Sequence, residues 1–584
     1  MKAVKLLSIT TALTLLLPLW PTRAQSESIF EQIRREHDEI EKYHSPSPAA
    51  SLLRPQATAA QSIDVTHYRL QIRLEFNPAM IRGSVTINLS TVAPASSIAI
   101  DAQSNLTVDA VRFDQSSKEF QRTNSQIKLN FPEPLAPSSD HTIAIDYHGP
   151  PSTSNLLGGG MLNTSHNGSP VMANLSEPYA APSWWPCIDN AADKATAETE
   201  ITVPAGMSAA SNGVLQKTEV NSDSTQTFFW REDYPLSTYL VSVAATNYVR
   251  FEDAYASLDG STTLPLVFMV YPEHEQLARQ KFAVTREAIE TLAPLYGEYP
   301  FINEKYGMVE FPWSGGMEHQ TMTSLGSNII GSASNTGRGV IVHELGHQWW
   351  GDLVTMADWH DIWLNEGFAT FTEVLFYERA LGLAPGDVMS QSYDDGSLNG
   401  ALGGTVHAEN LDNPFDDRGA IYTKGAWVLH MLRHVMGDEK FFSALREYGR
   451  RFAFSNASTV DFQSVCEEFF DGSLEWFFSQ WIYAPARPLY KISSSISPAG
   501  NQFTVKLTIK QKQSHTIPGR DTSTSRVYIM PLDVTLHYAD GSSETRVIWN
   551  DKRKQKFSFT VDKRPDRVAL DENDWVLKKV KGGS

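Results

Sequence analysis

Four residues of this chain have the types and spacing that suit metal-assisted hydrolysis. His343 and His347 are four positions apart, so on a helix both imidazoles project from one face and can bind one zinc ion. Glu344 lies between them and is placed to act as a general base on an activated water without being a ligand. Glu366, nineteen residues after His347, is the expected third ligand on a second helix. Two histidines and one glutamate leave the fourth zinc position open, which is typical of a catalytic site.

The five-residue pattern H-E-x-x-H is a weak signal alone, because two solvent-exposed histidines on a charged helix would produce it too. Its surroundings favour the metal site. The stretch IVHELGHQWW is apolar on both sides of the motif, so its polar residues are expected to be buried and to need partners. A site for one zinc ion per chain supplies those partners.

The elements that must position these residues are predicted to be helices. Apolar residues recur three and four positions apart over 274–297, and helical patterns follow at 338–350, 362–381, 422–436 and 460–482. We therefore expect a mainly α catalytic domain at 256–485.

Strand patterns flank this helical region. Period-two alternation rich in Val, Ile, Thr and Tyr begins at residue 63, which predicts an N-terminal domain of antiparallel sheets over 63–255. Alternation returns after Pro485 and predicts a β-sandwich at 486–584, with no helical domain after it. The expected fold class is multidomain α+β.

The first residues read as a targeting segment. Lys2 and Lys5 precede an apolar stretch, and small residues end at Ala24, so 1–24 is predicted to be a signal peptide with cleavage near Ala24. The apolar core is too short for a stable membrane anchor. Residues 25–62 are expected to form a charged helix and a linker rich in Pro, Ala and Ser. The mature protein is then secreted or periplasmic.

The composition excludes several classes of protein. Of 584 residues, 41% are hydrophobic and 20% charged, and the formal net charge is −18, which disfavours nucleic acid and anionic membranes as partners. Two cysteines, Cys187 and Cys466, are too few for a disulfide framework or a thiolate zinc cage. The oligomeric state is not encoded in these figures.

The run HELGHQWWGDLVTM followed by DIWLNEGFATF resembles the zinc aminopeptidases of the aminopeptidase N and leukotriene-hydrolase type, which are gluzincins with the pattern H-E-x-x-H, eighteen residues, then E. The resemblance covers nearly the whole chain. It implies a thermolysin-like catalytic domain between a β domain and a β-sandwich, and a reaction with peptides that have a free N-terminus.

The segment SGGMEHQT at 314–321 resembles the family's substrate strand G-x-M-E-N, which implies that Glu318 binds the α-amine of the substrate. A carboxylate fixed there favours an N-terminal ammonium over an internal amide. The alternative is a glycine-rich turn with a solvated glutamate. His319 stands where the family usually has asparagine. We expect this difference to alter either the pH dependence of the activity or the shape of the substrate pocket. The strand residues assigned to the amine site are Gly315, Gly316, Met317 and Glu318.

Two further segments resemble the family. AIYTKGAWVLHML at 420–432 implies that Tyr422 donates a hydrogen bond to the oxyanion of the tetrahedral intermediate, although a tyrosine at a helix start is otherwise a packing residue. ANLSEPYAAPSWWPCIDNAADKAT at 173–196 implies that Glu177 completes the amine site. The arginine usual before P-C in the family is missing here.

A ligand histidine needs a partner for its second ring N–H. Glu373 lies seven residues beyond Glu366 on the same predicted helical face and is one candidate; Asp352 and Asn365 are alternatives, and a solvated Glu373 is the opposing interpretation. The expected function is hydrolysis of the N-terminal peptide bond. The rivals are lipid-epoxide hydrolysis, endopeptidase activity, and a binding module with structural zinc or an inactive relative.

Overall fold

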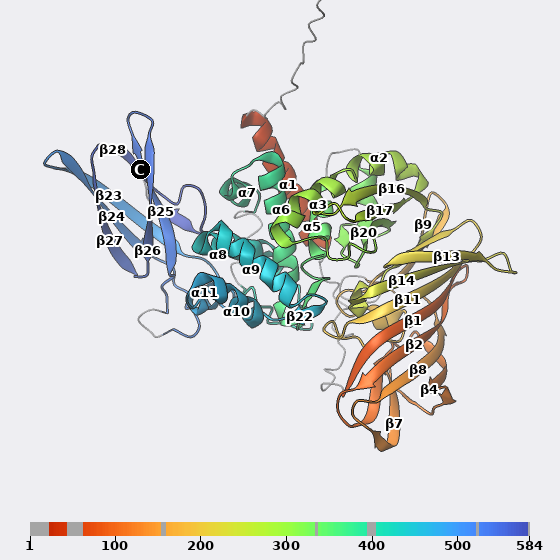
Figure 1. The fold of residues 1–584 in the computed structure, drawn as a ribbon. Coiled ribbons are helices and arrows are strands. Elements are labelled where there is room, and N and C mark those ends of the chain that lie inside the picture. Colours follow the sequence, from red (N-terminus) through yellow and green to blue (C-terminus); the bar gives the residue numbers. More distant parts are fainter. Residues whose placement is uncertain are drawn as a thin grey trace, which may run out of the picture.

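The computed structural model describes residues 23–43, 62–152, 159–332, 337–393, 404–520 and 525–581. Sheets lie at both ends of the molecule, with a helical region between them (Figure 1). Most of the predicted signal peptide and linker falls outside the described residues. Among the helices that are described, none combines the length and the apolar character needed to span a membrane.

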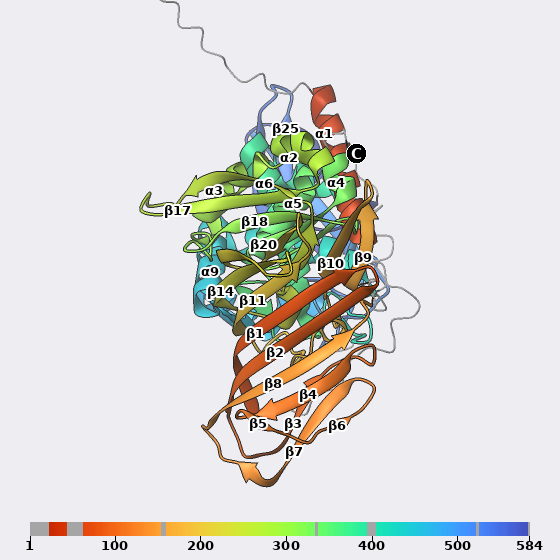
Figure 2. The ribbon, with the colours of Figure 1, turned by 90° about the vertical axis from the view of Figure 1, so that its right-hand side faces the viewer.

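The largest sheet has eight strands in the order β13-β14-β11-β1-β2-β8-β4-β5 (Figure 2). Burial alternates along β11, as the period of two requires when one sheet face packs on a core. The strands are β1 (Ile63–Phe76), β2 (Ala79–Thr91), β4 (Thr107–Phe113), β5 (Ser116–Ser117), β8 (Asp140–Gly149), β11 (Ala195–Val203), β13 (Val214–Val220) and β14 (Gln226–Leu236).

The expectation of purely antiparallel sheets is wrong at one place in this sheet. Strand β1 pairs with β11 in parallel, with His67 opposite Thr196, whereas its other neighbour β2 is antiparallel. Parallel neighbours need a long connection, and strands β2 to β10 lie between β1 and β11 in the sequence. Alternation of apolar and polar residues indicates which face of a strand is buried, but not whether its neighbour runs parallel or antiparallel. The sequence pattern therefore does not predict the parallel pairing of β1 with β11.

Two smaller sheets complete the N-terminal region. One consists of β3 (Ala95–Asp101), β7 (Gln126–Leu135) and β6 (Gln121–Arg122). The other contains β12 (Ser208–Ser211), β15 (Val243–Thr246), β10 (Ser169–Leu175) and β9 (Gly160–His166), and β10 leads directly to Glu177. Cys187 and Cys466 are both buried and neither forms a disulfide.

A five-stranded sheet in the order β16-β17-β18-β20-β19 supports the helical region. Its strands are β16 (Val249–Ala256), β17 (Thr263–Val270), β18 (Tyr306–Phe311), β19 (Gly316–Met317) and β20 (Met322–Gly326). All of strand β16 except its last residue falls in the range 63–255 expected for the N-terminal domain, but the strand hydrogen-bonds to β17. Strands β18 and β20 are buried throughout, so they lack the alternation that identifies half-exposed strands.

The helices pack on this sheet and on one another. They are α2 (Glu275–Lys281), α3 (Val284–Tyr296), α4 (Ser327–Gly331), α5 (Arg338–His347), α6 (Trp363–Leu381), α7 (Pro385–Ser392), a π-helix (Ala420–Lys424) that continues into α8 (Gly425–Met436), α9 (Asp438–Arg451), α10 (Thr459–Phe470) and α11 (Glu475–Trp481). A two-stranded parallel ribbon of β21 (Val354–Met356) and β22 (Ser455–Ala457) accompanies them. Helix α6 is buried over its first fifteen residues and therefore forms the centre of this region.

A pair of glycines lets α6 approach the π-helix and α8 closely. A Cβ atom on Gly367 would lie 2.9 Å from the Cα of Gly425, and a Cβ on Gly425 would lie 2.9 Å from the Cα of Gly367. Both contacts are with backbone, which cannot rotate away. The close approach therefore fixes how near the chain around Tyr422 lies to the helix that carries Glu366.

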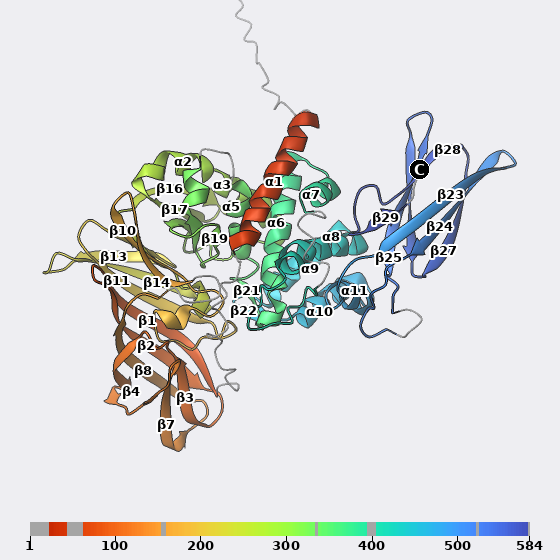
Figure 3. The ribbon, with the colours of Figure 1, turned by 180° about the vertical axis from the view of Figure 1, so that it is seen from behind.

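The C-terminal strands form two sheets, β27-β24-β23-β29 and β26-β25-β28. Their bounds are β23 (Leu489–Ala499), β24 (Gln502–Gln511), β25 (Met530–Tyr538), β26 (Ser543–Asn550), β27 (Lys554–Val561), β28 (Pro565–Leu570) and β29 (Lys579–Lys581). At the other end of the chain, α1 (Arg23–Tyr43) lies against α5 and α7 (Figure 3).

We expect Gly367→Ala to destabilise the protein by about 1–3 kcal/mol, because the new methyl group collides with the backbone of Gly425. Gly449→Ala in α9 is the matched control, since a Cβ there meets Trp350 at an ordinary 3.6 Å. Thermal unfolding of both variants measures the difference. Equal unfolding temperatures for the two variants would show that the α6–α8 spacing is not constrained at this point.

Candidate metal and amine site

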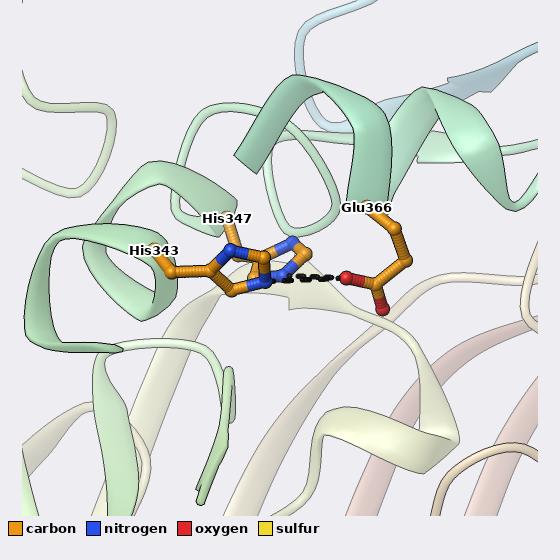
Figure 4. A group of neighbouring side chains, drawn as sticks. All are labelled: His343, His347 and Glu366. Atoms are coloured by element: carbon orange, nitrogen blue, oxygen red, sulfur yellow. Dashed lines mark hydrogen bonds and ion pairs between the residues drawn. The ribbon is translucent and has the colours of Figure 1, made fainter. Parts of the chain in front are cut away.

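The three expected ligands converge from two buried helices. His343 and His347 project from α5, and Glu366 projects from the first turn of α6 toward them (Figure 4). Glu366 Oε2 lies 3.3 Å from the Nε2 atom of each histidine. One ligand atom from each residue lies within 4.8 Å of the other two, and all three residues are buried.

Both histidine rings are oriented through Nδ1. Glu373 Oε1 lies 2.8 Å from His343 Nδ1, and the hydroxyl of Tyr393 donates to Glu373 Oε2 at 2.9 Å. His347 Nδ1 lies 3.1 Å from the carbonyl oxygen of Trp350. With Nδ1 protonated and donating in both rings, both Nε2 atoms keep a free lone pair toward Glu366.

Of the three candidates for orienting a ligand histidine, Glu373 is the one with a hydrogen bond to a ligand imidazole among the described residues. Asp352 instead accepts a hydrogen bond from Gln348 Nε2 at 2.7 Å. Asn365 accepts from the backbone N–H of Met356 at 3.3 Å and donates to the Tyr239 hydroxyl at 3.2 Å. Asp352 and Asn365 therefore hydrogen-bond to groups other than the imidazoles.

This donor set fits zinc. A tetrahedral zinc ion with ligands at about 2.0–2.1 Å holds neighbouring donor atoms about 3.4 Å apart, which matches the two 3.3 Å separations. Two neutral imidazoles and one carboxylate are also the ligand types of catalytic zinc sites with one position left open. His343, His347 and Glu366 would hold the ion.

Glu344 lies beside this group. Its carboxylate forms a second cluster with Glu318 and His347, in which one atom from each lies within 4.8 Å of the others. A Cβ on Gly316 would lie 2.2 Å from Glu344 Oε1, so only glycine lets β19 pass this close to the carboxylate. Burial raises the pKa of Glu344 to about 8, while the two histidines oppose that shift.

Glu318 follows β19 directly, and its backbone carbonyl is hydrogen-bonded to a side chain next to α5. Gln348, the residue after the second histidine, donates from Nε2 to the carbonyl oxygen of Glu318 at 3.4 Å. The same side chain accepts from the backbone N–H of Thr321 through Oε1 at 3.0 Å. Helix α5 thus positions the Glu318 strand as well as the metal ligands. Sequence reasoning missed Gln348, because its role depends on a long-range contact with backbone.

A third carboxylate, Glu177, reaches the same group of side chains from the loop after β10. One atom each from Glu177, Glu318 and Glu366 lies within 4.8 Å of the others, and all three are buried. Burial, then the charges of Glu318 and Glu366, hold the pKa of Glu177 well above its usual range. Such a concentration of buried acids is stable in its charged form only next to cations.

His319 is fully buried beside this cluster. Its Nδ1 lies 2.9 Å from Ser324 Oγ, and Asn174 Nδ2 lies 3.5 Å from its Nε2. Burial lowers the pKa of His319 to about 3, so the ring is neutral throughout the physiological range. Of the two effects expected of this departure from the family pattern, a change of pocket shape is the one consistent with a neutral ring.

Tyr422 lies in the π-helix Ala420–Lys424 rather than in a regular helix start. Its ring is nearly parallel to that of His343, with centroids 6.0 Å apart. Burial holds the pKa of Tyr422 well above its usual range, and the neighbouring Glu366 carboxylate raises it further. The phenol is therefore protonated at neutral pH and can donate a hydrogen bond. Single π turns of this kind are frequent at functional sites.

We expect Glu373→Ala to weaken zinc binding by about 10–100-fold, because His343 loses the acceptor that fixes its ring. Tyr393→Phe removes only the hydroxyl bound to the far oxygen of Glu373, so its effect is smaller. Competition with a chromophoric chelator measures both affinities. Wild-type zinc affinity in Glu373→Ala would contradict this role.

We expect His319→Asn to leave both limbs of the pH profile of kcat/KM in place between pH 5 and 9. The imidazole has already lost its proton above about pH 3, so removing it removes no titration in that range. Profiles of the wild type and the variant on one aminoacyl substrate provide the comparison. A displaced acidic limb in the variant would show that His319 takes up a proton during activity.

Two family models match the chain. Residues 281–481 match the peptidase family M1 domain, and residues 64–240 match the peptidase M1 N-terminal domain. Together these matches cover more than half of the chain, and the first contains both helices of the metal site.

Relatives with similar sequences are aminopeptidases by name. The chain is 27% identical to glutamyl aminopeptidase of Sus scrofa over 493 residues, which is 78% of this chain and 51% of that protein. It is 27% identical to aminopeptidase N of Haemonchus contortus over 565 residues, which is 86% of this chain and 55% of that protein. The chain spans about half the length of these curated relatives.

Solved structures show the same fold. Aminopeptidase A of Legionella pneumophila, in complex with aspartic acid, superposes with a TM-score of 0.76 over 90% of this chain and 60% of that one, at 18% identity. The M1 zinc metallopeptidase of Deinococcus radiodurans gives a TM-score of 0.64 at 26% identity, over 72% of this chain and 94% of that one. The two motif-bearing helices, the three ligands they bring together and the family models agree: the chain belongs to peptidase family M1.

Proposed function

We propose that this protein is a zinc-dependent aminopeptidase that hydrolyses the N-terminal peptide bond of peptides with a free α-amine. The observation that carries the proposal is the overlap of two sites. Glu366 belongs to the metal donor set and also lies within 4.8 Å of the carboxylates of Glu177 and Glu318. An ammonium group held by those carboxylates is therefore next to the metal position.

That overlap limits where a peptide can be cut. In an amino acid the α-nitrogen and the carbonyl carbon are two bonds apart, or about 2.5 Å. If the ammonium binds Glu177 and Glu318, the carbonyl beside the metal position belongs to the first residue. An internal peptide bond would bring an uncharged amide to two buried carboxylates, which costs free energy. Glu318 Oε1 is buried and has no hydrogen-bond partner among the described residues, which suits a cationic ligand.

The chemical step needs three roles besides ammonium binding. When bound, zinc supplies Lewis-acid activation of a water molecule and of the substrate carbonyl. We assign Glu344 to take the proton of the attacking water and to return it to the leaving amine. Its place among His347, Glu318 and β19, outside the donor set, supports that role.

Tyr422 is assigned to the oxyanion that forms at the scissile carbonyl. A buried phenol that stays protonated can donate a hydrogen bond there, and such a donor is worth about 3–4 kcal/mol in other enzymes. The stacking of Tyr422 against His343, with ring centroids 6.0 Å apart, supports this assignment. Glu373 then has the separate task of keeping His343 oriented.

Two finer assignments belong to the same proposal. Residues 1–24 are a signal peptide that delivers the enzyme to the periplasm or the exterior. The two C-terminal sheets form the β-sandwich that follows a thermolysin-like catalytic domain. The C-terminal strands form one four-stranded and one three-stranded sheet, which supports the assignment of a β-sandwich.

The proposal predicts a strong preference for an unblocked substrate. We expect an aminoacyl chromogenic substrate to be cleaved at least about 100-fold faster than its N-acetyl form, because acetylation removes the charge that Glu177 and Glu318 bind. Glu318→Gln should raise KM for the free-amine substrate by about 10–100-fold. Glu287→Gln, on the exposed face of α3, is the matched control.

Initial rates on the free-amine and the N-acetyl substrate, each with and without a chelator, test both the amine preference and the metal dependence. Cleavage of the acetylated substrate as fast as the free-amine substrate would contradict an aminopeptidase. Chelator-resistant turnover would contradict the role of the metal.

A further inference from the structure

Helix α1 carries two buried polar residues into the catalytic region. Its apolar side, which includes Phe30, Ile33 and Ile40, is buried, and α1 packs on α5 and α7 (Figure 3). Glu36 and His37 are buried with it, with 1% and 0% of their surface exposed. Buried polar groups cost free energy unless they are hydrogen-bonded, so their partners indicate what this helix contributes.

Glu36 binds the start of the helix that carries both histidine ligands. Its Oε2 accepts a hydrogen bond from the backbone N–H of Gly339, in the first turn of α5, at 2.5 Å. The residue at the usual capping position of α5 is Gly337, with φ 110°, and it offers no side chain. The carboxylate of Glu36, which is 303 positions away in the sequence, therefore satisfies an N–H group that local sequence leaves open.

The approach of Glu36 is specific in geometry and in charge. A Cβ on residue 339 would lie 2.7 Å from Glu36 Oε2, so glycine is required for the contact. Tyr377 of α6 donates to the same oxygen at 3.4 Å, which places Glu36 between the two ligand-bearing helices. A negative charge at a helix N-terminus is favourable because it complements the helix dipole.

His37 makes the corresponding contact with the Tyr422 segment. Its Nε2 lies 2.8 Å from Thr423 Oγ1, next to Tyr422 in the π-helix. The ring also packs edge-on against Tyr393, with centroids 4.6 Å apart. Tyr393 donates to Glu373, which in turn binds His343. Adjacent residues of α1 thus contact both the start of the metal helix and the segment that carries the proposed oxyanion donor.

We propose that Glu36 and His37 are positioning residues of the active site: α1 holds the start of α5 and the π-helix of Tyr422 in a fixed relation. The proposal rests on the function assigned above to Tyr422 and to the zinc ligands. It makes the segment at 29–40 part of the catalytic unit, although its sequence reads as a charged helix before a linker. A helix that served packing alone would need its apolar residues but neither of these hydrogen bonds.

The Glu36 contact is tested by the rate at which zinc leaves the protein. We expect Glu36→Gln to release zinc to excess chelator about tenfold faster than the wild type, because α5 loses the charge at its N-terminus. Glu31→Gln, the same change at an exposed position of α1, should release zinc at the wild-type rate. Equal release from Glu36→Gln and Glu31→Gln would overturn this part of the proposal.

The His37 contact is tested by separating kcat from KM. His37→Ala should lower kcat by about tenfold with KM within about twofold, because the displaced Tyr422 is needed in the transition state and not for ammonium binding. His37→Gln, whose side-chain amide can still hydrogen-bond to Thr423, should recover most of kcat. In a double-mutant cycle, Thr423→Val should add little to His37→Ala.

Three outcomes would overturn the His37 role: unchanged kcat in His37→Ala, equal losses in the Ala and Gln variants, or additive losses in the cycle. These results are distinct from a failure of the proposed function. A wild-type protein that cleaves no aminoacyl substrate would refute the aminopeptidase assignment, whereas zinc release would still test Glu36.

Discussion

The structure depends on one electrostatic constraint: several carboxylates and two imidazoles are buried close together. Burial raises the pKa of Glu177 and of Glu344, and the charges of Glu318 and Glu366 raise both pKa values further. Such a group is stable in its charged form only when cations occupy the space between its members. A metal ion between the histidines and Glu366, and an ammonium group between Glu318 and Glu177, would satisfy the constraint together. On the proposed function, the metal ion and the substrate amine would both supply positive charge to the same group of buried carboxylates.

The fold brings these charged side chains together because the helices α5 and α6 and the strand β19 meet at the site. Helix α5 provides both histidines, Glu344 and, through Gln348, the support of the Glu318 strand. Helix α6 provides Glu366 and, two turns later, Glu373. Small residues allow these elements to meet, since β19 passes Glu344 at a glycine and α6 meets α8 at a pair of glycines. Substitutions at the glycine pair between α6 and α8 therefore act on the site through the spacing of these helices. In the five-stranded sheet, β19 pairs with β20, and this pairing fixes the position of Glu318, which follows β19.

The sequence revealed the parts of the site whose geometry is local. Helical spacing placed His343 and His347 on one face, and a seven-residue interval placed Glu373 near them, because a helix converts spacing into direction. It could not reveal the partner of His347, which is a backbone carbonyl, or the tasks of Asp352 and Asn365, which depend on loop geometry. The parallel pairing of β1 with β11 and the contacts of α1 with α5 join distant segments, and no local pattern encodes such contacts.

On the proposed function, Glu344 separates metal binding from the chemical step, because it lies beside His343, His347 and Glu366 but is not one of these three ligands. The most direct measurement is therefore the zinc content and turnover of Glu344→Gln, compared in the same preparation. If Glu344 is the proton carrier, the variant retains one zinc ion per chain and loses turnover by about a thousandfold or more. Turnover close to that of the wild type, or loss of zinc together with activity, would contradict the role assigned to this residue.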